Sequence, residues 1–288
     1  GGFRPDAPDP FGFVEARRTG GDGRWRPLPA LPTPRANLSA ADLDGIVYAV
    51  GGLGADVDGD TPLLDVVERY DPATGSWASS PSMPVPRAAP GVAGFEGRLY
   101  VAGGEVAGAD GWDVTDSVIA YDPVDGTWRE VAPLPTARTR LRLVATGGHL
   151  YAVGGFGNPP VALPAVERYD PTRDTWDPVA PMTEPRGLPG AVAARWGDRD
   201  VVVVVGGGQG ELFTPTFTVA DSTEVYDVDA DKWQALDARL PRGRVSLVCA
   251  LEADGSVLAI GGATGEPTPL RPTALVQALA LPTGREPH

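Results

Sequence analysis

Three arginines that alternate along one short segment are the residues of this sequence best suited to binding an anion. Arg138, Arg140 and Arg142 are each two residues apart, and a β-strand places side chains at this spacing on one face. A guanidinium offers paired N–H donors that match the oxygens of a carboxylate or phosphate. The spacing therefore predicts three long cationic side chains on one side of a strand.

Carboxylates supply the other candidate chemistry, because the sequence has only two histidines and one cysteine, Cys249. No Ser-His-Asp arrangement, metal site, disulfide or cofactor is predicted from so few groups. The run Asp56 to Asp60 superficially resembles a calcium loop, but it lacks the glycine and the distal glutamate of that motif and is interpreted as a solvated acidic loop. The candidates for a general acid or base are aspartates in variable segments: Asp65, Asp113, Asp116 and Asp221.

A repeat of about fifty residues must position these side chains. Gly-Gly pairs begin at residues 51, 103, 154, 206 and 261, and four of them are followed by Tyr-Asp and then by Trp seven residues after the Tyr. β-Branched and aromatic residues precede each Gly-Gly, and a turn sequence such as Asp71 to Gly75 separates two further segments. Each unit therefore predicts four antiparallel strands.

This set of motifs resembles the kelch repeat over residues 11–284. The resemblance implies an all-β fold, a five-bladed kelch β-propeller with four antiparallel strands per blade, whose last blade is closed by N- and C-terminal strands. Residues 13–288 are expected to form a single domain after an extended N-terminal segment at 1–12. Residues 13–17 and 274–280 compete for the third strand of the closing blade. Most kelch propellers have six or seven blades, so a fragment of a larger ring is an alternative.

Residues common to all blades are interpreted as structural, and residues that break the repeat as functional. Arg142 breaks the repeat, because the other blades have Gly or Ser at the aligned position. The repeated arginines are expected to bond carbonyls or acids between blades; they are Arg35, Arg87, Arg138, Arg186 and Arg242.

In kelch domains that bind acidic peptides, the position aligned with Asn37, Arg140 and Arg244 lies at the mouth of the central channel. The resemblance therefore implies a pocket in which Arg140, Arg142 and Arg244 anchor an anionic group. In the alternative interpretation these arginines only pair with loop carboxylates.

Aromatic residues in the variable loops fall outside the repeat pattern. Trp112, Phe156 and Phe213, with Phe217, are predicted to form a nonpolar rim around the ligand. The alternative is that these side chains hold long loops against the blades.

The predicted function is a ligand-binding propeller that recognises an anionic small molecule or an acidic peptide. The first alternative is an isomerase, lyase or cyclase acting on a carbohydrate or specialised metabolite with a loop aspartate as acid/base, since kelch proteins similar to this one include a sialic-acid mutarotase. The second alternative is a protein-interaction scaffold. Whether the protein is an enzyme is left open.

Composition narrows the possible partners. The formal net charge of −14 disfavours nucleic acid, and the aliphatic run Val201–Val205 is too short for a membrane helix. The abundance of arginine, against Lys232 as the single lysine, indicates a bacterial source. A soluble, cytoplasmic monomer is expected, although the Gly-Gly start indicates a trimmed N-terminus and leaves export open.

Overall fold

The computed structural model describes all residues except 1, 5–6, 59, 110, 266–269 and 282–288. Every regular element of this described part is a β-strand, so it contains no helix that could cross a membrane. The contacts within the chain divide it into two compact units, Gly1–Thr139 and Arg140–His288. That residues 13–288 form a single domain stays a prediction.

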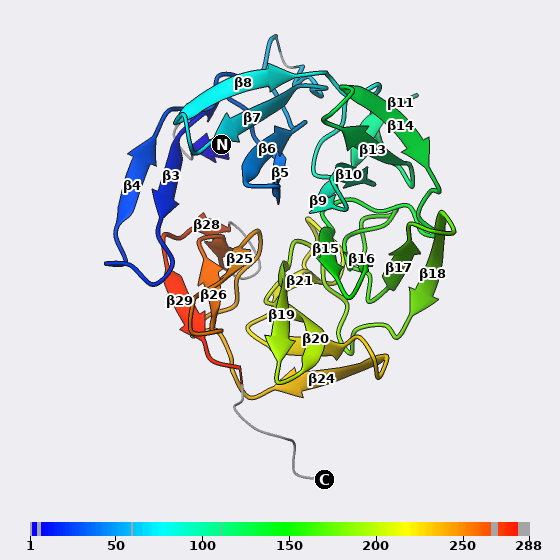
Figure 1. The fold of residues 1–288 in the computed structure, drawn as a ribbon. Helices are drawn as coiled ribbons and strands as arrows, with labels where there is room; N and C mark the ends of the chain where they lie inside the picture. Colours follow the sequence, from blue (N-terminus) through cyan, green and yellow to red (C-terminus); the bar gives the residue numbers. More distant parts are fainter. Residues whose placement is uncertain (1, 5–6, 59, 110, 266–269, 282–288) are drawn as a thin grey trace. The chain divides into compact units, whose positions relative to one another are not determined.

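The first unit contains two complete four-stranded antiparallel sheets (Figure 1). Their strands are β5 (Ser39–Leu43), β6 (Ile46–Val50), β7 (Val67–Asp71) and β8 (Ser76–Ser80), then β9 (Gly91–Phe95), β10 (Arg98–Ala102), β13 (Val118–Asp122) and β14 (Thr127–Val131). Three hairpins accompany them: β1 (Gly2–Arg4) with β2 (Ala7–Phe11), β3 (Val14–Arg17) with β4 (Trp25–Leu28), and β11 (Glu105–Gly108) with β12 (Gly111–Val114).

The second unit contains two more four-stranded sheets and one of three strands. They are β15 (Arg142–Thr146), β16 (His149–Val153), β17 (Val166–Asp170) and β18 (Thr175–Val179); β19 (Gly190–Trp196), β20 (Arg199–Val205), β23 (Thr223–Asp227) and β24 (Lys232–Leu236); and β25 (Val248–Leu251), β26 (Val257–Ile260) and β29 (Val276–Leu279). Two short hairpins complete it: β21 (Gly208–Gln209) with β22 (Thr218–Val219), and β27 (Ala263–Thr264) with β28 (Arg271–Pro272).

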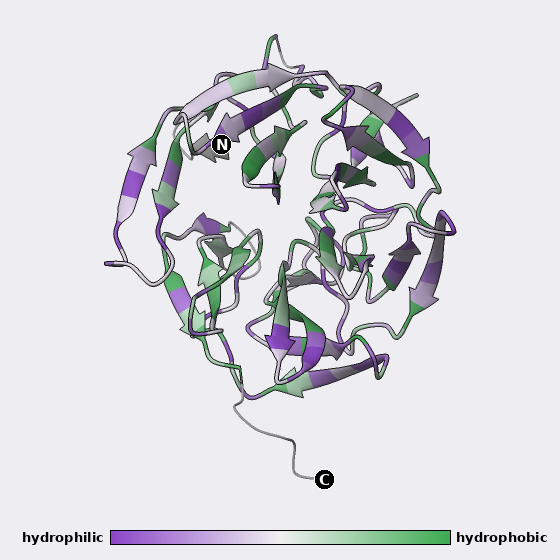
Figure 2. Cartoon of the chain, viewed as in Figure 1, coloured by the Kyte–Doolittle hydropathy of each residue, from purple (hydrophilic) through white to green (hydrophobic). Residues whose placement is uncertain are grey.

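These sheets confirm the predicted fold class, the five-bladed β-propeller. The second strand of each blade is nonpolar because both of its faces are covered; Figure 2 shows β6 in green and the outer strand β8 mostly pale. The repeated tryptophan packs on the repeated tyrosine, with ring centroids 5.3 Å apart for Tyr70 and Trp77. The indole N–H of Trp77 donates to the Pro29 carbonyl, which ties the outer strand to the segment entering its blade.

Four of the five Gly-Gly pairs join one blade to the next through the amide of their second glycine. The amide of Gly52 donates to the carbonyl of Arg87 in the following blade at 2.9 Å. Gly52 has a φ of 112°, and a Cβ there would lie 2.5 Å from the Ala36 carbonyl oxygen. Only glycine allows both this backbone conformation and this close approach.

Strand pairing near the chain termini decides one alternative that the sequence left open and shows a hairpin in the N-terminal segment. β29 pairs with β26, so the C-terminal segment supplies the third strand of the last blade. β3 pairs with β4 in the first unit, and closure of the last blade by an N-terminal strand stays a prediction. Residues 1–12 contain the hairpin β1–β2 instead of one extended segment.

We predict that Gly52→Ala lowers the free energy of unfolding by at least ~2 kcal/mol, because strain and a backbone clash add. Gly45 is the control: its φ is 80°, but a Cβ there would meet nothing within 4 Å. Gly45→Ala is expected to cost only ~1 kcal/mol. Urea unfolding of both variants measures the difference, and equal costs would contradict the close-approach explanation.

Candidate functional site

A fully buried arginine organises the entrance of each blade, as Arg35 shows. Its exposed fraction is 0%, and its guanidinium donates to the carbonyls of Thr33, Ala49 and Gly51. It also pairs with Glu68, which is itself 3% exposed and accepts a hydrogen bond from Thr33. The interpretation of this repeated position as structural is supported by these contacts.

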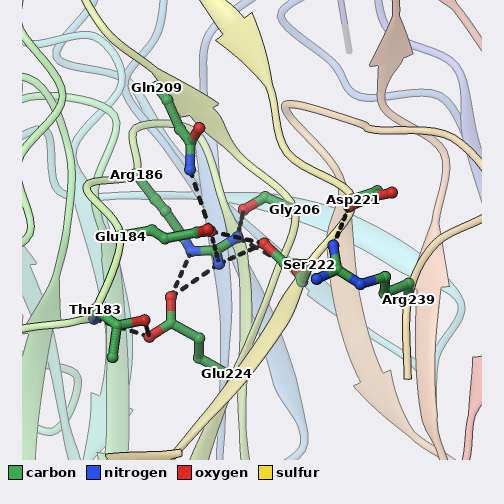
Figure 3. Close-up of polar contacts among 9 residues, drawn as sticks. All are labelled: Thr183, Glu184, Arg186, Gly206, Gln209, Asp221, Ser222, Glu224 and Arg239. Atoms are coloured by element: carbon green, nitrogen blue, oxygen red, sulfur yellow. Dashed lines mark hydrogen bonds and ion pairs between the residues drawn. The ribbon is translucent and has the colours of Figure 1, made fainter. Parts of the chain in front are cut away.

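Arg186 forms a second network of this kind, drawn in Figure 3. It donates to the carbonyls of Gly206 and Ser222 and to the Ser222 hydroxyl. Glu224 accepts from it at 2.8 Å, and a second carboxylate, Glu184, accepts at 2.7 Å. Glu184 differs from Glu224 in exposure, since 45% of its side chain is accessible against 1%.

The repeated arginine of the last blade is Arg244, which corrects the sequence alignment. Arg244 is 1% exposed and donates to the carbonyls of Ala259, Gly261 and Leu275. Arg242, placed at this position from the sequence, is exposed. Arg244 is therefore built into its own blade and does not occupy the position of Asn37 and Arg140.

Arg142 is also used inside the fold. It begins β15, and its Nε donates to the Pro189 carbonyl at 2.7 Å while an Nη donates to the Leu247 carbonyl at 3.0 Å. These acceptors lie just before β19 and just before β25, so one side chain links three consecutive blades. Burial lowers the pKa of Arg142 and raises the pKa of the neighbouring Cys249 to about 12.

The residues two places after each repeated arginine share one backbone conformation. Asn37 and Arg140 have φ values of 49° and 55°, and their carbonyls accept from the amides of Ala89 and Leu188 in the next blade. Ser246 occupies this position in the last blade: its φ is 57°, and its backbone amide donates to the Leu188 carbonyl. Arg140 is half-buried and Asn37 is exposed.

Three of the candidate acid/base aspartates occupy a single repeated position. The carbonyls of Asp65, Asp116 and Asp221 accept from Met83, Leu134 and Leu240, respectively, which precede the repeated arginines by four residues. A position repeated in this way fits a structural role better than chemistry performed once. Asp221 also pairs with Arg239 at 2.7 Å, and Asp113 is exposed on β12.

The aromatic candidates divide by burial. Phe156 is fully buried against Phe217, so a rim contact is wrong for Phe156 and both rings pin their loops. Trp112 and Phe213 are 48% and 82% exposed. Both lie on hairpins inserted between the second and third strands of a blade.

The structure also shows what sequence reasoning missed. The other inserts present exposed nonpolar residues, Val57 at 64% and Val161 at 41%. Glu184 was not among the predicted site residues, although variation among blades at its position was a signal for it. The other blades have Thr33, Val85, Thr136 and Arg242 at that position. Within the described residues, no group of three His, Cys, Asp or Glu side chains is placed to hold a metal ion.

Comparison with known proteins agrees with this geometry. A β-propeller is the class of protein defined by the sheets, and the solved structure of YjhT matches 95% of this chain and 99% of its own, with a TM-score of 0.74 at 20% identity. The Kelch motif model matches residues 34–84, 86–135 and 137–183. The chain belongs to the kelch-repeat family.

Curated relatives are longer proteins. The chain is 28% identical over 232 residues to Kelch-like protein 41a of Danio rerio, covering 80% of this chain and 36% of that protein. It is 34% identical over 153 residues to the human Kelch repeat and BTB domain-containing protein 13, covering 52% and 31%. The chain thus spans about a third of the length of these relatives.

We predict that Arg244→Ala lowers the free energy of unfolding by about 3 kcal/mol, because three backbone carbonyls inside the blade lose a charged donor. Arg242→Ala, two residues away and exposed, is the matched control and is expected to change stability by less than about 0.5 kcal/mol. Denaturant unfolding compares the two variants. If Arg244→Ala left the free energy of unfolding unchanged, Arg244 would again be a candidate for ligand contact.

The thiol of Cys249 gives a second prediction. Because burial raises its pKa from 9.0 to about 12, alkylation by iodoacetamide is expected to keep accelerating as the pH rises above 9. In denaturant the rate should level off near the ordinary thiol pKa. A folded-state profile that levels off near pH 9 would show that the thiol is not desolvated.

Proposed function

We propose that this chain is a protein-interaction module whose contact residues lie on the segments inserted between the second and third strands of its blades. The observation that supports this proposal is the shared exposure of one nonpolar side chain on each of four inserts: Val57, Trp112, Val161 and Phe213. Nonpolar groups held out in water at element tips are the usual anchors of protein interfaces. The name of one relative, Kelch repeat and BTB domain-containing protein 13, places kelch repeats beside a second domain in a longer protein, which is consistent with a module.

Anion binding through the arginines is a weaker proposal on this geometry. Arg142 and Arg244 already donate to two and three backbone carbonyls, respectively. A ligand would have to replace these bonds, and leaving buried carbonyls unpaired is costly.

The module is tested by removing the four anchors together, as Val57→Ser, Trp112→Ser, Val161→Ser and Phe213→Ser. Because all four side chains are exposed, we expect an unchanged melting temperature and loss of binding. Proteins captured on the immobilised chain from an extract of its source cells are purified, and each dissociation constant is measured directly for both forms. The expected loss is at least a hundredfold.

A panel of anionic metabolites provides the opposing test by thermal shift. A stabilising metabolite whose effect disappears in Arg140→Ala, together with captured partners that bind the quadruple variant unchanged, would contradict the interaction module. That result would favour the ligand-binding alternative.

A further inference from the structure

Phe213 is an exposed nonpolar residue held in a backbone conformation that phenylalanine disfavours. Its φ is 65° and its exposed fraction is 82%. It is the third residue of a turn in which the Thr214 amide donates to the Glu211 carbonyl at 3.3 Å. A positive φ at this position of a turn favours glycine or asparagine, and a bulky side chain there is an outlier.

The loop around Phe213 is held firmly. Leu212, the residue before it, is 6% exposed, and its amide donates to the Pro160 carbonyl at 2.9 Å. On the other side, the Thr214 hydroxyl donates to the Glu211 carbonyl at 2.8 Å. The fold therefore maintains a disfavoured conformation at a residue that buries almost nothing. Such local strain is typical of functional positions.

A carboxylate with a fixed orientation, that of Glu184, is hydrogen-bonded to Gln209 (Figure 3). One oxygen of Glu184 accepts from Arg186 at 2.7 Å, from Gln209 at 3.1 Å and from Ser222 at 2.7 Å. The charge of Arg186 is already matched by the buried Glu224. The half-exposed Glu184 therefore adds a net negative charge that faces solvent and can attract a cation.

Gln209 connects the two features. It is the last residue of β21, its side chain binds Glu184, and Phe213 follows four residues later. Four residues span at most ~14 Å, so both groups lie within reach of one short extended peptide. Val161, 41% exposed and bridged to Glu211, extends the nonpolar surface.

We propose that Phe213 and Glu184 form the docking surface for an extended peptide segment of a partner protein. The segment carries an arginine or lysine that pairs with Glu184 and, a few residues away, nonpolar side chains that cover the Phe213 ring. The net charge of −14 favours a basic partner. This inference rests on the proposed function and specifies the chemistry of the partner.

The test begins with a phage-displayed library of random linear peptides, selected on the whole chain. Selected peptides are expected to share a basic residue close to a nonpolar one. Synthetic copies are then titrated against Phe213→Asn and Glu184→Gln by fluorescence anisotropy. Each substitution is expected to weaken binding at least tenfold, and added salt should reduce the effect of Glu184→Gln because that contact is between charges.

Matched controls are Val124→Asn, which removes a side chain that is 94% exposed on a different turn, and Glu130→Gln, at an exposed strand position. Both are expected to bind within twofold of the unmodified chain. Phe213→Asn should melt at the same or a higher temperature, because asparagine tolerates the left-handed conformation. A lower melting temperature would make Phe213 a structural residue and overturn the proposal.

Failure of this surface is separable from failure of the interaction module. Peptides that bind every variant alike, peptides without a basic residue, or an empty selection would each overturn the Phe213–Glu184 surface. If Trp112→Ser instead abolished peptide binding, the surface would be wrong while the module would stand. Whether the captured partners still bind the quadruple variant tests the interaction module itself, and this test does not depend on which peptides are selected.

Discussion

A buried guanidinium at the entrance of each blade is the constraint on which the rest of the structure depends. Removing such a charge from water costs several kcal/mol, so its donors must find acceptors in fixed places. Two of the carbonyls that accept hydrogen bonds from Arg35 are those of Ala49 in β6 and of Gly51 directly after that strand. Those carbonyls converge only when the strands are in register and the chain turns at the Gly-Gly pair, so the arginine and the glycines require each other.

Carbonyl oxygens, more than carboxylates, are the constant partner in this arrangement. Arg35 has Glu68, but the position of that acid is Ile119 in the next blade, where Arg87 bonds only to the Gly103 carbonyl and to Ser117 among its described contacts. Burial lowers the pKa of Arg87 to about 10. The blade therefore tolerates loss of the counter-charge, provided that the backbone acceptors remain, which explains why glutamate is an unreliable marker of the repeat.

The strands were predictable from the sequence because local geometry determines their markers: glycine where φ is positive, tryptophan where an indole reaches the preceding linker. The register of the last blade was not predictable, because Arg242 directly follows a proline, as Arg35, Arg87 and Arg186 do, whereas Arg244 follows a glycine. Only the buried Leu240, four residues before Arg244, shows that Arg244 is the arginine that turns inward. The exposed site was found only in part. Phe156 and Phe213 look equivalent in sequence, yet one is buried and the other projects into water, a distinction set by packing between loops.

The left-handed residues that follow each arginine have an evolutionary consequence. At Asn37, Ala89, Arg140, Leu188 and Ser246 the bond to the neighbouring blade is made by the main chain. Amide, methyl, guanidinium, isobutyl and hydroxyl groups are all accepted there, because none of them is needed for that bond. Mutation can diversify these positions while the framework stays intact, which makes them natural places to engineer a new specificity into this scaffold.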